Sequence, residues 1–235
     1  MSSGICEPDW VDSIRKFYLT YRPNSSIMLS MAKDTHTPSS IGRPREFEIE
    51  DAVRKAMGVF WDHGYHDASL PDLLDGMGLS RGSFYKAFSD KRGVFLRALD
   101  VYIDDSIRKT SEMLSSNTSP KAAIRDAFSC YAGLSSGKEG LRGCFVVLTA
   151  TEMLPGDEEV LIRIARLFRR LQDLFAAAII RAQALGEIDH SLNERTFARF
   201  LVCQIQGMRV LGKAGADRGD MQAMVDLALK PLNWA

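Results

Sequence analysis

The amino-acid sequence predicts an all-α fold, and three observations support this prediction. From residue 47 onward, apolar residues recur three and four positions apart, which is the period of an amphipathic helix. Glycine and proline stand mostly at the ends of these periodic segments, where they end or begin helices. The β-branched segment 143–154 would suit a strand, but no second strand is predicted elsewhere, so we expect a buried helix there. The 235 residues are 46% hydrophobic, which suffices for one sizeable domain or for two smaller ones that share a helix.

Two short helices separated by a glycine turn form the most informative stretch of the sequence. Ser69 is a suitable N-cap for the first helix, and Gly78 can end that helix in the left-handed conformation. Ser80 can then cap a second helix, in which Phe84 and Phe88 would face the core. This arrangement is typical of a helix-turn-helix motif.

The second of these helices would turn a polar face outward. An arginine can bond the edge of guanine at two points, so Arg81 is the candidate for base recognition. Hydroxyl and amine groups suit contacts to phosphates. The candidates for phosphate contact are Ser69, Ser83, Tyr85, Lys86 and Lys91. The helix start adds Ser80 and Gly82 to the predicted DNA-binding set, because a serine and a glycine there let the backbone come close to another surface.

The flanking segments add two more helices, over residues 47–65 and from residue 91 onward. Together with the helix-turn-helix they closely resemble the DNA-binding domain of TetR/AcrR-type transcriptional repressors over residues 46–106. The matching positions are Ala56, Phe60, His63-Gly-Tyr65, Leu73, Gly78-Leu-Ser80, Gly82-Ser-Phe-Tyr85, Phe88, Lys91 and Phe95-Leu96. The resemblance implies a homodimer whose two helix-turn-helix motifs enter successive major grooves of a palindromic operator.

Residues 1–45 do not match this family and are predicted to be an N-terminal extension, mostly disordered. One interpretation is that the native protein begins further along, at Met28 or Met31. A second is a basic arm, in which Arg43 and Arg45 enter a narrow A/T-rich minor groove. A third is a solvated basic linker.

Residues 107–235 are predicted to form a helical ligand-binding and dimerisation domain. Its helices are expected at 120–132, 143–154, 157–185, 193–214 and 217–229. A long helix over 91–114 would join it to the DNA-binding domain. In the resembled family, this connecting helix is how ligand occupancy moves the recognition helices.

Aromatic, apolar and sulfur-containing residues of the second domain could line an apolar pocket for a small-molecule inducer of unknown identity. Ordinary core packing is the alternative for each of them. The predicted pocket set is Tyr102, Phe128, Tyr131, Cys144, Phe145, Leu148, Phe168 and Phe175.

The last two helices are apolar over more than one face, so each must be covered on both sides. In the resembled family these helices pair with their counterparts as a four-helix dimer interface, which supplies the two-fold symmetry of a palindromic operator. The predicted interface residues are Phe200, Gln204, Met208, Leu211, Met224 and Leu227.

Cys144 is a candidate sensor residue. The segment Arg142-Gly-Cys-Phe-Val-Val-Leu-Thr-Ala-Thr-Glu-Met153 is similar to the start of the sixth helix in a branch of the family that includes electrophile-sensing and oxidant-sensing repressors. A thiol in the first turn of a helix, next to Arg142, would have a stabilised thiolate and a higher reactivity. A small buried residue without a sensing role is the alternative.

The composition excludes several other classes of protein. With 30 basic and 30 acidic residues the net charge is zero, so any DNA contact must come from a local patch. No apolar run approaches the ~20 residues of a membrane span, and no signal peptide is recognisable, so a cytoplasmic protein is expected. The histidines are scattered and the cysteines lack C-x-x-C spacing, which predicts neither a metal site nor a cofactor.

No nucleophile, base and orienting group can be assembled from the spacing, so an enzyme is not predicted. The sequence instead predicts a repressor that a small apolar ligand releases from operator DNA. The first alternative is a redox-sensing or electrophile-sensing repressor acting through Cys144. The alternative of another class is a helical dimer that acts through protein partners without binding DNA.

Overall fold

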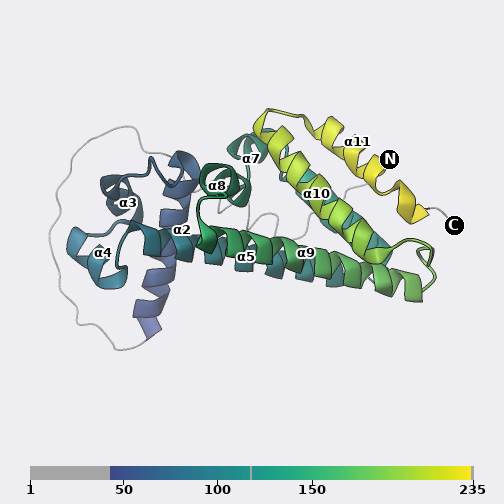
Figure 1. The fold of residues 1–235 in the computed structure, drawn as a ribbon, viewed down its shortest axis with the longest axis horizontal. Helices are drawn as coiled ribbons and strands as arrows, with labels where there is room; N and C mark the ends of the chain where they lie inside the picture. The colour runs from purple at the N-terminus through teal and green to yellow at the C-terminus, as the bar shows by residue number, and fades with distance from the viewer. Residues whose placement is uncertain (1–42, 117, 234–235) are drawn as a thin grey trace, which may run out of the picture. The chain divides into compact units, whose positions relative to one another are not determined.

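The computed structural model describes residues 43–116 and 118–233, and the regular secondary structure of these residues is entirely helical (Figure 1). The predicted all-α fold is therefore confirmed. Predictions for residues 1–42 lie outside the described part. The helices are α2 (Arg43–His63), α3 (Leu70–Met77), α4 (Arg81–Ala87), α5 (Lys91–Ser115), α6 (Pro120–Gly133), α7 (Gly137–Arg142), α8 (Phe145–Met153), α9 (Glu158–Ala184), α10 (Glu194–Lys213) and α11 (Arg218–Ala228), followed by a 3-10 turn, η1 (Lys230–Asn233).

Helix α2 begins at Arg43, so the expected start at residue 47 was wrong by four residues. Arg43 and Arg45 consequently belong to the first turn of α2 and not to a segment ahead of it. Pro44 is compatible with this start, because a proline in the first turn of a helix gives up no intrahelical hydrogen bond.

Helices α2, α3 and α4 enclose a small core beneath the helix-turn-helix. Phe60, Leu73 and Phe84, one from each helix, are at most 1% exposed. Helix α3 crosses α2 closely at Gly76, where a Cβ atom would lie 2.5 Å from Val59 Cγ2. A glycine in a helix costs about 1 kcal/mol relative to alanine, and here it makes the close crossing possible.

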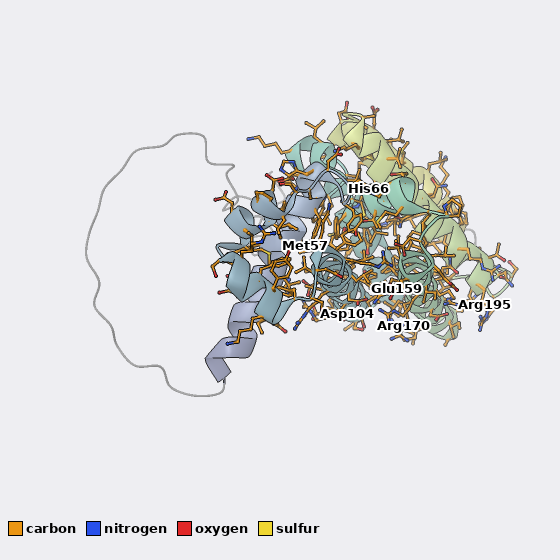
Figure 2. All side chains as sticks on the ribbon, turned by 60° about the vertical axis from the view of Figure 1, so that its left-hand side comes forward. Met57, His66, Asp104, Glu159, Arg170 and Arg195 are labelled. Atoms are coloured by element: carbon orange, nitrogen blue, oxygen red, sulfur yellow. The ribbon has the colours of Figure 1, made fainter. Side chains whose placement is uncertain are left out.

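The second domain is built around the long helices α5 and α9, which run side by side (Figure 1). Helix α10 packs along α9, while α6 contacts both long helices and α11 packs mainly on α6. Figure 2, in which Asp104 marks α5 and Glu159 marks the start of α9, shows side chains filling the space between the helices. The short helix α8 packs against α5 and α9, close to the DNA-binding domain.

The adjacent ends of α5 and α9 are joined by a cluster of charged groups. Arg92 donates to Asp157 over 2.5 Å and 3.0 Å and to Glu159 over 2.7 Å. Asp157 also caps α9 by accepting a bond from the amide of Val160 at 3.1 Å. The hydrogen bonds from Arg92, more than any other contact, lower the pKa of Asp157 from 3.8 to about 2.

We expect this ion pair to stabilise the fold above pH 4 and to lose its effect as the pH falls toward 2. The sign follows from linkage, since a carboxyl group whose pKa is lowered by folding stabilises the folded state only while it is ionised. Urea unfolding of wild type and Arg92→Met at a series of pH values should give a free-energy difference that shrinks between pH 5 and pH 2. Arg97→Met, which alters an exposed arginine of the same helix, is the control. A difference that stays constant over this range would contradict the assignment.

Candidate DNA-binding surface and its junction with the second domain

The helix-turn-helix is held by local caps of the predicted kind. Ser80 Oγ accepts a hydrogen bond from the amide of Ser83 at 3.1 Å, and Gly78 ends α3 at a φ of 67°. Phe84 and Phe88 are 0% and 5% exposed, so both face the core as predicted. Helix α4 is therefore anchored on one side and capped at its start.

The outward face of α4 carries the side chains that sequence analysis assigned to DNA. Six residues of this seven-residue helix are exposed: Arg81, Gly82, Ser83, Tyr85, Lys86 and Ala87. The guanidinium carbon of Arg81 lies 5.9 Å from the centre of the Tyr85 ring, within the range of a cation–π contact. This face offers two cations and several hydroxyl donors, which is the chemistry that phosphates and guanine edges accept.

Three of the predicted phosphate contacts have hydrogen-bond partners inside the subunit. The hydroxyl of Ser83 lies 3.0 Å from that of Ser80, and the other two are Ser69 and Lys91. Ser69 caps α3 and donates to Asp72, and this side-chain hydrogen bond is the main reason why the pKa of Asp72 is lowered. The amine of Lys91 donates to the carbonyl of His66 at 3.1 Å and lies 4.8 Å from the centre of the Tyr65 ring. The side chains of Ser69 and Lys91 therefore hold the helix-turn-helix in place, in addition to any contact that they make with DNA.

An aromatic cluster joins α2 to the start of α8. The Trp61 ring lies 5.3 Å from Tyr102 and 5.7 Å from Phe145, and the latter two rings are 5.7 Å apart. The Tyr102 hydroxyl and Cys144 Sγ are 3.4 Å apart. Tyr102, Cys144 and Phe145, three residues of the predicted pocket set, therefore lie together. Trp61, which lies beside them, was not part of that set. Its position at the end of the apolar stripe of α2 was the available signal.

Arg142 makes a second connection between these parts of the chain. Its guanidinium lies 4.5 Å from the centre of the Trp61 ring and donates to Asp62 at 3.1 Å. The sequence predicts that Arg142 lies beside the Cys144 thiol and stabilises its thiolate. In the structure, these two contacts of Arg142 are with Trp61 and Asp62 of α2. Cys144 itself is the N-cap residue of α8 and is 7% exposed.

The remaining predicted pocket residues are distributed through the helical core. Phe128 and Phe175 are fully buried, while Leu148 and Phe168 are half-buried. Tyr131 shares a 2.6 Å hydrogen bond with Thr110, and burial raises its pKa to about 12. A shallow surface depression lies elsewhere, on α5, and none of the eight predicted residues lines it. Its lining residues are Asp104, Ile107, Arg108, Ser111, Glu112 and Ser115.

The last two helices expose an apolar face. Of the six predicted interface residues, Gln204 is half-buried, Met208 does not belong to this face, and the exposed ones are Phe200, Leu211, Met224 and Leu227. Met208 is 2% exposed and points into the subunit core, so its assignment to the interface was wrong. The stripe along α10 instead passes through Gly207, one residue earlier, because the exposed positions follow a spacing of three and four from Phe200. The exposed residues of the two helices include Phe200, Cys203, Gly207, Val210, Leu211, Met224 and Leu227.

Two family models match the chain, one in each domain. Residues 52–98 match the model for bacterial regulatory proteins of the tetR family, and residues 120–227 match the tetracyclin repressor-like C-terminal domain. Two curated relatives are each 30% identical. The regulator YezE of Bacillus subtilis strain 168 aligns over 82% of this chain and all of its own length. The repressor ComR of Escherichia coli K12 aligns over 81% of this chain and 91% of its own length.

Solved structures agree with the fold. The TetR family regulator CifR, as a cysteine mutant complexed with 26-base-pair operator DNA, superposes with a TM-score of 0.70 at 28% identity. That match covers 85% of this chain and all of CifR. The reduced form of E. coli NemR has a TM-score of 0.68 at 16% identity over 77% of this chain and 95% of its own, which shows the shared fold alone.

The helix-turn-helix and the helical second domain define a DNA-binding transcriptional regulator. The chain belongs to the TetR family. Proteins of this family bind DNA and are not enzymes. No helix within residues 43–116 or 118–233 is long and apolar enough to cross a membrane.

Proposed function

We propose that this protein is a homodimeric repressor that a small apolar ligand releases from a palindromic operator. The observation that carries the proposal is the exposed apolar face of α10 and α11. Val210 and Leu227 are 54% and 64% exposed on it. A second copy of the chain would cover this face, and the resulting two-fold axis would present two α4 helices to two operator half-sites.

The packing of α10 supports a close helix crossing at this face. Gly207 lies in the middle of the exposed stripe, and a Cβ atom there would have nothing within 4 Å in the subunit. A glycine at this point lets the backbone of a partner helix approach, with Phe200 and Leu211 on either side of it along α10. Both side chains are about 40% exposed, as expected of apolar side chains that a second subunit would cover.

The chemistry of α4 supports operator binding, and the relative ComR is named as a transcriptional repressor. Arg81 is proposed to recognise a base, while Ser83, Tyr85 and Lys86 are proposed to contact phosphates. Arg43 and Arg45, at the start of α2, are also proposed to bind DNA. An inducer would bind more tightly to a conformation in which the two α4 helices do not match the operator than to the DNA-binding conformation. Only such a difference in affinity can shift the equilibrium between the two conformations.

Leu227→Glu is expected to dissociate the dimer and to weaken operator binding at least tenfold. The glutamate would place two like charges in an apolar contact across the two-fold axis. Sedimentation velocity gives the oligomeric state, and fluorescence anisotropy with an operator selected from random DNA gives the affinity. Ile162→Glu is the matched control, since Ile162 is 56% exposed on α9, outside the face formed by α10 and α11. A Leu227→Glu protein that stays dimeric would contradict the proposed interface.

Sensing through Cys144 is a second candidate, favoured by the contact between its thiol and the Tyr102 hydroxyl at the junction with α2. A group added to this sulfur would displace the aromatic rings that connect α8 to the DNA-binding domain. N-ethylmaleimide would serve as the probe electrophile. Release of the operator from wild type, with retention by Cys144→Ser, would favour this candidate over a reversible ligand.

A further inference from the structure

Glu152, near the end of α8, makes a contact to the DNA-binding domain that its sequence position does not suggest. Its carboxylate accepts a hydrogen bond from the amide of Tyr65 at 2.9 Å and another from the amide of His66 at 2.7 Å. Both amides belong to the turn between α2 and α3. Hydrogen bonds from an amide to an ionised carboxylate are stronger than those between neutral groups.

The turn is shaped to receive this carboxylate. Gly64 ends α2 with a φ of 82°, and the two amides that follow it point toward the same oxygen pair. Successive amides after such a left-handed residue form a small concave site for an anion. A Cβ atom on Gly64 would lie 3.0 Å from one oxygen of Glu152, so the carboxylate rests directly against the backbone of the turn.

Helix α8 therefore contacts the DNA-binding domain at both of its ends. At its start, Phe145 packs on Trp61 of α2, and at its end Glu152 binds the turn that leads into α3. A helix of nine residues separates these two contacts by roughly 10 to 13 Å. Two separated contacts fix the orientation of the DNA-binding domain relative to α8, whereas a single contact would not.

We infer that Glu152 is a positioning residue for operator recognition, because it holds the turn that sets the direction of α3 and α4. This inference rests on the proposed operator binding. A dimer must present both α4 helices at the spacing of the operator half-sites, so a loosened turn lowers specific affinity. Binding to unrelated DNA is mainly electrostatic and tolerates a range of orientations.

Glu152→Asp tests the inference while leaving the net charge unchanged. Aspartate is one methylene shorter and withdraws the carboxylate by about 1.5 Å, beyond hydrogen-bond distance from the turn. We expect about tenfold weaker binding to the selected operator and unchanged binding to a scrambled duplex of equal length, both measured by anisotropy on the full chain. Residue-resolved hydrogen exchange should show that the amides of Tyr65 and His66 lose protection.

The matched control is Glu158→Asp, which makes the same substitution at an exposed position in the first turn of α9. It should leave operator affinity and amide protection as in wild type. Full operator affinity in Glu152→Asp despite loss of protection at Tyr65 and His66 would overturn the inference. Equal losses for both duplexes together with a lowered Tm would also overturn it, because that result indicates a role in folding only.

Failure of the proposed function would look different. Wild-type protein would then bind the selected and scrambled duplexes equally, and this would remove the basis for both proposals. The exchange measurement needs no DNA, so it reports separately whether Glu152 holds the turn.

Discussion

Arg81→Ala is expected to lower operator affinity about 5- to 150-fold for each of the two half-sites that the proposed dimer binds, the range given by the ~1–3 kcal/mol that a bidentate arginine–guanine contact contributes. Arg81 is exposed on the outward face of α4, one residue after the cap Ser80, so its side chain is free to extend into a major groove. The loss should be confined to the operator, because unrelated DNA offers no guanine at the required position. Anisotropy titrations with operator and scrambled duplexes at several salt concentrations measure both effects.

Lys86→Ala provides the comparison for a phosphate contact on the same helix. Removing such a contact from both subunits of the proposed dimer should weaken binding to both duplexes alike and reduce the slope of log affinity against log salt by about 2, or about 1 for each phosphate contact. If Arg81→Ala behaved in this way, Arg81 would be a phosphate contact and base recognition would belong to another residue. Tyr85→Phe removes the hydroxyl but keeps the ring beside the Arg81 guanidinium. This variant therefore tests whether the cation–π contact is sufficient to orient Arg81.

Gly212→Ala is expected to destabilise the subunit by about 3 kcal/mol, at the upper end of the usual cost of overpacking a core. A Cβ atom on Gly212 would lie 2.1 Å from the carbonyl oxygen of Ser135 and 2.8 Å from its carbonyl carbon. These are backbone atoms, and Ser135 is held by hydrogen bonds to Tyr131 and Ala132. Relief of the clash would therefore require α10 to move away from the segment between α6 and α7.

Thermal unfolding of Gly212→Ala should show a decrease in Tm of roughly 6 to 12 °C, given about 2–4 °C per kcal/mol for a protein of this size. Gly133→Ala is the control, because a Cβ atom at the end of α6 would meet nothing within 4 Å. Alanine should be neutral or slightly stabilising there, since it restricts the unfolded chain. A Gly212→Ala protein with the wild-type Tm would show that the helices can separate at this point without cost.

Local signals were sufficient for most of the helices and for the face of α4. The cap of Ser80, the left-handed turn at Gly78 and the burial of Phe84 all depend on residues within four positions along the chain, and sequence analysis identified each of them. The β-branched segment was also correctly predicted as the helix α8. In such cases the periodicity and the capping residues contain the structural information themselves.

Helix α7 and the register of the exposed apolar face of α10 could not be predicted in the same way. Helix α7 has six residues and two glycines, and its Gly140 packs against the backbone of Ser135 and Gly212. So short a helix has little intrinsic stability, and packing supplies the rest. On α10, an apolar pattern on more than one face left the choice between Met208 and Gly207 to the packing of the subunit core.

The sequence by itself determined the fold class, the family and the residues on the outward face of α4, because these follow from spacing within single helices. Only the tertiary structure decided that Glu152 binds the turn after α2, that Trp61 meets Phe145, and that Gly212 touches Ser135. Each of these contacts joins residues far apart in the chain, and each depends on backbone positions accurate to a fraction of an ångström. Short-range periodicity carries no information about such distances.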